Sequence, residues 1–189
     1  PVTLLLALCA ATLQDESTAR ALQREFPDRS VSYLLIRLEN RETAAARWPD
    51  VDTPIPVGSL VKPFLLLAYG EAHQPRFPRL TCPGGRDRCW RPSGHGVTGV
   101  REALAGSCNH YFRELARNTP ESALRSVLHR YGLPPPARDD PDSWIGAGDA
   151  WRIPPAAMAT AYAELLRRSA EPAAGAAIAT RSTLFFVSA

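Results

Sequence analysis

One heptapeptide, Gly-Ser-Leu-Val-Lys-Pro-Phe at residues 58–64, constrains this chain more than any other segment. Proline is tolerated only in the first turn of a helix, where backbone N–H groups have no partner anyway. Pro63 therefore predicts a helix that starts at the glycine or the serine of this segment. The apolar run after Pro63 carries the helix into a core, and we expect it to end at Gly70. Residues three apart share one helix face, so the side chains of Ser59 and Lys62 can meet.

Lys62 is the only lysine of the chain, since the other 21 of its 22 basic residues are arginines. A free serine is a poor nucleophile, and a free lysine, with a pKa of about 10.4, is a poor base at neutral pH. Burial and the positive end of a helix dipole lower the pKa of a lysine, and the neutral amine can then accept a hydroxyl proton. Arginine cannot act as such a base. The pair Ser59 and Lys62 therefore predicts an activated nucleophile, although Ser-x-x-Lys also occurs by chance in many proteins.

The composition is that of a globular protein of about one domain, with 45% hydrophobic and 22% charged residues among 189. This length is sufficient for a sizeable core. The net charge of +3 comes from dispersed arginines and not from a basic cluster, which argues against binding of nucleic acid. No cofactor is predicted.

The first 16 residues form a segment of their own. Residues 2–11 are apolar and are followed by polar residues. Ten residues are too few to span a bilayer as a helix, which takes about 20, and we interpret them as the remnant of a signal peptide's apolar region. The bulky Leu8 disfavours a lipoprotein at Cys9, and a buried N-terminal helix is the alternative. A cleaved leader would place residues 17–189 outside the cytoplasm.

The rest of the chain predicts an α+β fold. A helix over 17–27 precedes two strands, 30–38 and 43–48, which we expect to form a hairpin. Residues 71–96 are rich in Pro, Gly and Arg and predict a long loop. Besides the helix that carries Ser59, helices are predicted from Thr98 to Ala105, from Asn109 onward, over 121–131 and over 156–168.

Cys82 and Cys89 flank a stretch rich in turn formers. In an exported protein this spacing suits a disulfide that closes a loop, and we predict that pairing. The alternative is a metal site completed by His95, Cys108 or His110, which we do not favour because there is no Cys-x-x-Cys pair. Cys108 is then predicted to be a buried free thiol.

A second polar triplet, Ser107-Cys108-Asn109, lies between two predicted helices. A hydroxyl and a carboxamide one residue apart on such a turn can face the same cleft. The serine can then relay protons, and the amide can bind a substrate carbonyl or amide. Ser-x-Asn alone is common in turns, so its weight comes from its combination with Ser-x-x-Lys.

In this order the two triplets resemble the transpeptidase domain of the penicillin-binding proteins, in the serine β-lactamase and penicillin-binding superfamily. The motif set of that superfamily is Ser-x-x-Lys, Ser-x-Asn and Lys-Thr/Ser-Gly. Residues 58–64 look like the nucleophile segment of class B-like members. Residues 94–96 with 102–112 are similar to the second motif and its approach helix, and residues 145–163 resemble the glycine turn and helix that follow.

The resemblance implies roles for four residues. Ser59 would be the acylated nucleophile, Lys62 its general base, Ser107 a proton relay, and Asn109 a ligand of the substrate amide and of Lys62. The backbone N–H of Ser59 would form half of an oxyanion hole. The substrates would be D-Ala-D-Ala stem peptides of peptidoglycan in the periplasm or bacterial cell envelope, with β-lactams as covalent inhibitors. A membrane tether in the full-length protein stays open.

The third motif is missing, because a chain whose only lysine is Lys62 cannot contain Lys-Thr/Ser-Gly. We therefore expect residues 17–189 to be a D,D-transpeptidase domain truncated at its C-terminus. This domain would consist of a helical subdomain carrying both motifs, an N-terminal β-hairpin and an incomplete antiparallel sheet. Two alternatives are kept: a serine β-lactamase or D,D-carboxypeptidase, and a non-catalytic homologue that senses β-lactams or acts as a scaffold.

Overall fold

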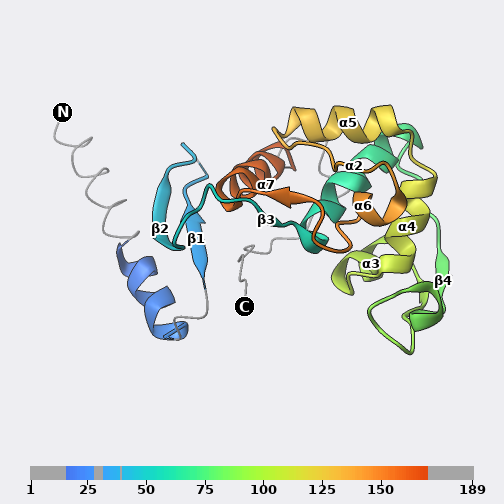
Figure 1. The fold of residues 1–189 in the computed structure, drawn as a ribbon, viewed down its shortest axis with the longest axis horizontal. Helices are drawn as coiled ribbons and strands as arrows, with labels where there is room; N and C mark the ends of the chain where they lie inside the picture. Colours follow the sequence, from blue (N-terminus) through green and yellow to red (C-terminus); the bar gives the residue numbers. More distant parts are fainter. Residues whose placement is uncertain (1–15, 28–31, 39, 170–189) are drawn as a thin grey trace. The chain divides into compact units, whose positions relative to one another are not determined.

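The computed structural model describes residues 16–27, 32–38 and 40–169. The chain forms two compact units, one made of residues 54–154 and the other of the segments before and after them (Figure 1). The segment predicted to be a signal-peptide remnant, with Cys9, lies outside the described residues. Among the described residues, no helix combines the length and the apolar character needed to cross a membrane.

The unit formed by the two flanking segments contains a helix over residues 16–25, the strands β1 (Tyr33–Ile36) and β2 (Thr43–Arg47), and the helix α7 (Pro155–Ser169). β1 and β2 pair antiparallel, which confirms the predicted hairpin. α7 packs against β1, and Arg41 donates a hydrogen bond of 2.7 Å to the carboxylate of Glu164. Proline suits the first position of a helix because its missing N–H is not needed there, as at Pro155.

The unit of residues 54–154 combines helices with short antiparallel strand pairs, and the α+β prediction is confirmed. β3 pairs with β6, and β4 pairs with β5. In chain order the elements are β3 (Ile55–Pro56), the 3-10 turn η1 (Gly58–Val61), α2 (Lys62–Ala72), β4 (Leu80–Cys82), the 3-10 turn η2 (Gly84–Asp87), β5 (Gly96–Thr98), α3 (Val100–Ala105), α4 (Asn109–Arg117), α5 (Glu121–Arg130), α6 (Pro141–Trp144) and β6 (Arg152–Ile153).

Helix α2 is central to this unit and packs against α5 and α4 (Figure 1). The helical segment begins at Gly58 as predicted, but its first four residues form the 3-10 turn η1. The α-helix α2 itself begins at Lys62, with Pro63 in its first turn. Phe64 and the apolar residues after it are largely buried in the core. The predicted end at Gly70 is wrong, since α2 continues past it. A Cβ at Gly70 would lie 3.3 Å from the ring of Phe77, so this glycine makes room for a packed aromatic side chain.

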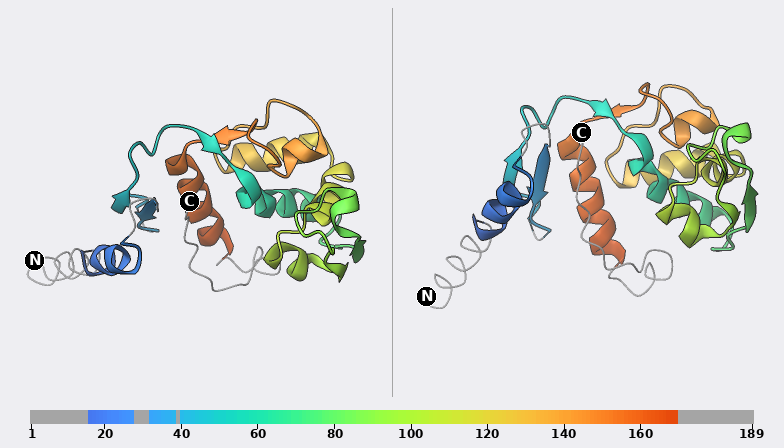
Figure 2. Two further views of the ribbon diagram at one scale, coloured as in Figure 1. Left: turned by 60° about the horizontal axis from the view of Figure 1, so that its bottom comes forward. Right: turned by 90° about the horizontal axis from the view of Figure 1, so that it is seen from below.

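The segment predicted to be an irregular loop, 71–96, contains β4 and η2. Figure 2 shows the β4–β5 hairpin beside α3 and α4, which it contacts. Gly84 and Gly94 close the loop with φ of +86° and +74°, in the left-handed region that favours glycine. A Cβ at Gly84 would lie 2.2 Å from the backbone oxygen of Pro92, and one at Gly94 would lie 2.2 Å from that of Cys82. The segment is therefore a tightly closed turn.

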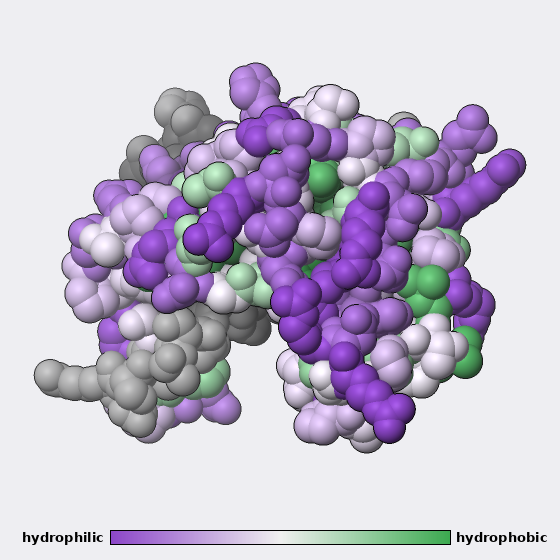
Figure 3. All heavy atoms as spheres, turned by 45° about the vertical axis from the view of Figure 1, so that its right-hand side comes forward, coloured by the Kyte–Doolittle hydropathy of each residue, from purple (hydrophilic) through white to green (hydrophobic). Residues whose placement is uncertain are grey.

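Hydrophilic residues cover most of the face drawn in Figure 3, as a chain with 22% charged residues predicts. Arg113 on α4 is different, because only 3% of it is exposed. Its guanidinium donates to the backbone oxygens of Asp87 at 2.8 Å and Arg88 at 3.2 Å and pairs with the carboxylate of Asp142. Arg113 thus ties the end of η2 to α4.

Candidate active site

Lys62 lies at the start of α2 and is fully buried. Its Nζ donates three hydrogen bonds: to the backbone oxygen of Ser107 at 2.9 Å, to Ser107 Oγ at 2.8 Å and to Asn109 Oδ1 at 2.7 Å. An ammonium group has three donors, so all of them are used. The fold thus brings the lysine of the first motif together with both polar residues of the second.

Burial lowers the pKa of Lys62 to about 8, because the charged amine loses its stabilisation by water. Of the charged and titratable groups near it, Cys108 and Cys89 act in the opposite direction and Arg113 acts in the same direction. A neutral amine is therefore accessible near neutral pH.

The partners of Lys62 decide which hydrogen bond changes when Nζ loses a proton. The backbone oxygen of Ser107 and the Oδ1 of Asn109 can only accept, so each must keep a donated N–H. The hydroxyl of Ser107 can accept or donate. A neutral Lys62 therefore keeps its two remaining N–H bonds and directs its lone pair at Ser107 Oγ.

Ser107 bridges Ser59 and Lys62, which the sequence predicted to meet directly. Its Oγ lies 2.7 Å from Ser59 Oγ, with which it shares a hydrogen bond. Ser59 is exposed, whereas Lys62 is fully buried. Because hydroxyl hydrogens rotate, a proton can pass from Ser59 through Ser107 to the amine. The three residues thus form a continuous path from the surface to a buried base.

Ser107 adopts a φ of +47°, which is uncommon and strained for a residue other than glycine. Its N–H donates to Leu104 O at 3.1 Å, and the N–H of Cys108 donates to Ala103 O at 2.9 Å. The turn between α3 and α4 is therefore held by backbone bonds to α3 as well as by the side chain of Lys62.

The turn that carries Ser59 packs against a second glycine turn. Gly146 has a φ of +69°, and a Cβ on it would lie 2.0 Å from the backbone oxygen of Gly58. The pairing of β3 with β6 continues beside it, where the N–H of Val57 donates to Trp151 O at 3.0 Å. Only glycine fits this approach, so the glycine turn predicted from the sequence positions the backbone that precedes Ser59.

A cluster of cysteines and a histidine lies next to these residues. The predicted disulfide between Cys82 and Cys89 is not formed, since Cys82, Cys89 and Cys108 are free, buried thiols. Their sulfur atoms and a ring nitrogen of His95 all lie within 4.8 Å of one another, and we call these four residues the Cys3His cluster. The sulfur atoms of Cys82 and Cys89 both face His95 and do not pair.

His95 and Cys108 join the cysteine pair, as in the alternative that the sequence analysis named and did not favour. The other histidine considered, His110, instead contacts the carboxylate of Asp87. Two long-range features create the cluster: the pairing of β4 with β5, and the α3–α4 turn that presents Cys108. One feature of the sequence could have indicated this cluster. Cys108 lies between Ser107 and Asn109, and a buried thiol at that position needs surroundings different from those of its two polar neighbours.

Comparisons with known proteins identify a family and similar solved structures. A family model described as the penicillin binding protein transpeptidase domain matches residues 30–179. One similar solved structure is penicillin-binding protein A from M. tuberculosis, in a ceftriaxone acyl-enzyme complex, with a TM-score of 0.47 and 23% sequence identity. The similarity covers 67% of this chain and 35% of that chain, so this chain corresponds to about a third of its length. No curated protein matches.

Proposed function

This chain belongs to the penicillin-binding protein transpeptidase domain family, and we propose that it forms a serine acyl-enzyme of the D,D-transpeptidase type. Ser59 would be the nucleophile, and the substrate would be the D-Ala-D-Ala end of a peptidoglycan stem peptide. β-Lactams would acylate the same serine. The reaction would take place in the bacterial cell envelope, outside the cytoplasm, where peptidoglycan is assembled.

One observation carries this proposal: the hydrogen-bonded path from exposed Ser59 through Ser107 to buried Lys62. A serine needs a base within reach, and a lysine needs a lowered pKa to be that base. Both conditions hold here, because the path has bonds of 2.7 and 2.8 Å and burial lowers the pKa of Lys62 to about 8.

The proposed acylation step moves one proton along this path. Ser59 Oγ attacks the carbonyl carbon of the penultimate D-Ala while its proton passes to Ser107 Oγ. The proton of Ser107 passes in turn to Lys62 Nζ. When the tetrahedral intermediate collapses, the C–N bond breaks and the proton returns through Ser107 to the leaving amine. Attack by an acceptor amine on the ester at Ser59 would then repeat the sequence in reverse.

Asn109 would bind the substrate. Its Oδ1 accepts from Lys62 at 2.7 Å, which fixes the orientation of the carboxamide and leaves the NH₂ group to donate to a substrate carbonyl. The backbone N–H of Ser59 would supply one donor of an oxyanion hole. In this family the Lys-Thr/Ser-Gly strand binds the substrate carboxylate and precedes the second donor. The 189 residues contain no such segment, so acylation by this chain alone should be slow.

The proposal is tested by intact-mass measurement after incubation with benzylpenicillin. The samples are the chain, its Ser59→Ala variant, and a form extended along its reading frame to include the third motif. We expect one acyl adduct on the extended form and none after Ser59→Ala. Ser126→Ala, which changes an exposed serine on α5, is the matched control and should keep the adduct. The proposal fails if no folded form is acylated, or if the adduct persists in Ser59→Ala.

A further inference from the structure

We propose that Cys82, Cys89, His95 and Cys108 bind one Zn²⁺ ion in a tetrahedral site, and that this ion holds the turn that carries Ser107 and Asn109. The proposal goes beyond acyl transfer, since its ligands are not the residues that would react with substrate. It concerns a structural ion, because four protein ligands leave no open position for water or substrate.

The distances within the Cys3His cluster fit a tetrahedral ion. Nδ1 of His95 lies 3.6 Å from Cys82 Sγ and 3.5 Å from Cys89 Sγ. A tetrahedron with Zn–S bonds of about 2.3 Å and a Zn–N bond of about 2.0–2.1 Å has S···N edges of roughly 3.5–3.6 Å. All four ligand atoms lie within 4.8 Å of one another, so small side-chain movements complete the site.

The hydrogen bonding of His95 leaves its Nδ1 able to bind a metal ion. Its Nε2 lies 3.1 Å from the backbone oxygen of Gly106, which can only accept, so Nε2 carries the proton. Nδ1 then carries no proton, and its lone pair is directed at the sulfur atoms of Cys82 and Cys89. A histidine that binds a metal usually donates its other N–H to a carbonyl or carboxylate in this way.

The backbone around the cluster has the form of a metal-binding turn. β4 ends at Cys82, and Gly84 and Gly94 allow the chain to fold tightly between the cysteine and His95. The spacing differs from Cys-x-x-Cys because the hairpin, and not a short local motif, brings the ligands together.

Burial and composition favour an ion over a disulfide. Cys82, Cys89 and Cys108 are 3%, 5% and 0% exposed. A disulfide would use two of these sulfur atoms and leave the third thiol and the imidazole in the same buried space. An ion with charge 2+ uses all four groups, and it also protects the thiols in an oxidising compartment, where free cysteine pairs tend to become disulfides.

The proposed ion acts on the active site through Cys108. Cys108 lies between Ser107 and Asn109, and both of these neighbours contact Lys62. The strained φ of +47° at Ser107 persists only where surrounding contacts fix it. A metal–sulfur bond at Cys108 would attach this turn to β4 and to the hairpin. His95 and the two hairpin cysteines are therefore positioning residues for the second motif.

The test measures metal and not activity, so its failure is distinct from a failure of the proposed function. The chain is prepared under reducing conditions with Zn²⁺, dialysed, and its metal content is measured by plasma mass spectrometry together with native mass spectrometry. We expect one Zn²⁺ per chain. X-ray absorption should show three sulfur atoms at about 2.3 Å and one nitrogen at about 2.0–2.1 Å.

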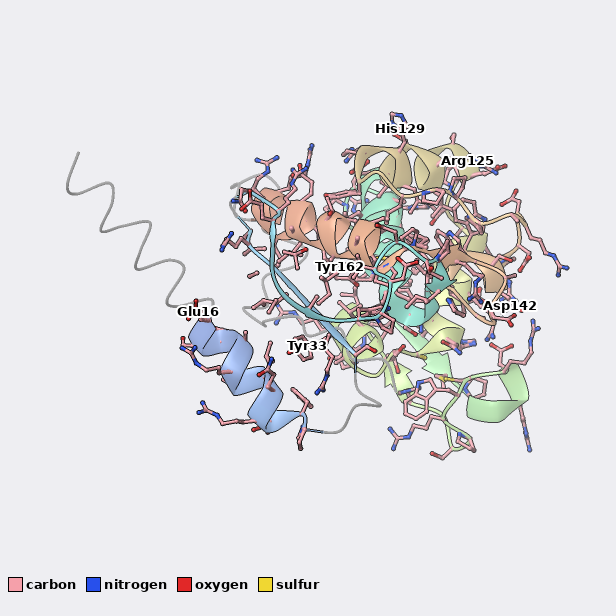
Figure 4. The ribbon with its side chains drawn as sticks, turned by 60° about the vertical axis from the view of Figure 1, so that its left-hand side comes forward. Glu16, Tyr33, Arg125, His129, Asp142 and Tyr162 are labelled. Carbon is pink, nitrogen blue, oxygen red and sulfur yellow. The ribbon has the colours of Figure 1, made fainter. Side chains whose placement is uncertain are left out.

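Matched variants locate the ion. Cys89→Ser and His95→Gln should weaken Zn²⁺ binding by more than the roughly 10–100-fold typical of losing an outer-shell partner. His129→Gln is the control and should retain one ion; the side chain of His129 projects away from α5 (Figure 4). Removal of Zn²⁺ by a chelator should lower the Tm of the unsubstituted chain, because the ion stabilises the folded state.

Three results would overturn the proposal. The first is a folded, reduced chain that takes up no Zn²⁺. The second is a Zn²⁺ content that neither Cys89→Ser nor His95→Gln reduces, which would identify an adventitious ion. The third is a chain that, isolated without added oxidant, already contains a disulfide between Cys82 and Cys89 and does not take up Zn²⁺ after reduction.

Discussion

The two sides of the turn formed by Ser107, Cys108 and Asn109 have different chemistry. On one side Ser107 and Asn109 hydrogen-bond Lys62, and Ser107 reaches the exposed Ser59. On the other side Cys108 joins two buried thiols and the half-buried imidazole of His95. In the proposed function the first side moves protons and must remain open to substrate. The second side connects the turn to the β4–β5 hairpin. Under the two proposals, a strained turn that carries catalytic residues is supported from the side that takes no part in the reaction.

Lys62→Met has the largest expected effect and removes the proton acceptor of the proton-transfer side. Methionine is similar in length, and it removes the base without adding charge. Because general-base catalysis typically contributes about 10²–10⁴-fold, acylation of Ser59 by benzylpenicillin should slow by that factor. Time-resolved intact-mass measurement follows the rate on whichever form of the chain is acylated.

Zn²⁺ content serves as the internal control for Lys62→Met. It should remain at one ion per chain, since Lys62 belongs to the other side of the turn. Arg117→Met removes an exposed cation of α4 and should leave the acylation rate within a factor of two or so. A rate loss below tenfold in Lys62→Met would show that Lys62 is not the base, and simultaneous loss of the ion would show that the two sides are not separable.

Arg113→Gln tests how much the contact between η2 and α4 contributes to stability. This contact supports the side of the turn that carries Cys108, which we call the metal-binding side. Arg113 is 3% exposed and holds the end of η2, between the two hairpin cysteines, against α4. Its loss leaves the backbone oxygens of Asp87 and Arg88 without this donor, whereas the carboxylate of Asp142 keeps Arg88 at 2.7 Å. We expect a loss of about 2 kcal/mol in the free energy of unfolding, the scale of leaving buried polar groups without a partner.

Urea unfolding of Arg113→Gln and Arg117→Gln gives the comparison. Arg117 forms an exposed pair with Glu114 three residues away, and such pairs contribute roughly 0.5 kcal/mol or less. Equal losses in the two variants would mean that the attachment of η2 to α4 contributes little to stability.

Each motif of the proton-transfer side was predictable from the sequence, because each is local. Their convergence joins residues 45–48 positions apart, and it was expected only from the family resemblance. Ser59 and Lys62 are three residues apart near a proline that fixes a helix start, and Asn109 opens the next helix as predicted. The N-terminal hairpin and the helices also follow from periodicity and turn formers. The ends of the helices do not follow in this way. Gly70 lies inside α2, where the absence of a Cβ leaves room for the ring of Phe77.

The metal-binding side was not predictable in the same way. The strands β4 and β5 have three residues each, which is too short for an alternating pattern to be recognised. The spacing of Cys82 and Cys89 fits a disulfide equally well by loop length alone. Only the long-range pairing of the hairpin and the position of Cys108 decide which atoms converge. The spacing therefore indicated that Cys82 and Cys89 lie close together. It favoured a disulfide between them, which is not formed.

Gly146→Ala perturbs the proton-transfer side through Ser59. A Cβ there would lie 2.0 Å from the backbone oxygen of Gly58, so that backbone must shift. Gly148 also has a positive φ, of +81°, but a Cβ there meets nothing within 4 Å. Both alanines are strained, and we expect Gly146→Ala to cost about 2 kcal/mol more than Gly148→Ala. The free energy of unfolding from urea titration measures the difference.

The two glycine variants should also differ in acylation. Displacement of Gly58 moves Ser59, so the rate should fall in Gly146→Ala and stay near that of the unsubstituted chain in Gly148→Ala. Zn²⁺ content should be unchanged in both. If the two variants are equally stable and equally reactive, the close approach of Gly146 to Gly58 does not position the nucleophile.

The pH dependence of acylation has the smallest expected effect and tests the proton-transfer side. Lys62 must be neutral to accept a proton, and burial lowers its pKa to about 8, with Cys108 and Cys89 opposing this shift and Arg113 adding to it. Below that pH the fraction of Lys62 that is neutral falls about tenfold per pH unit, which corresponds to about 1.4 kcal/mol. The acylation rate should therefore rise with pH up to about 8 and level off above it. The residual rate of Lys62→Met should lack this rise, because the titrating group is gone. A rise that persists in Lys62→Met would assign the titration to another group and would remove the lysine from the proton path.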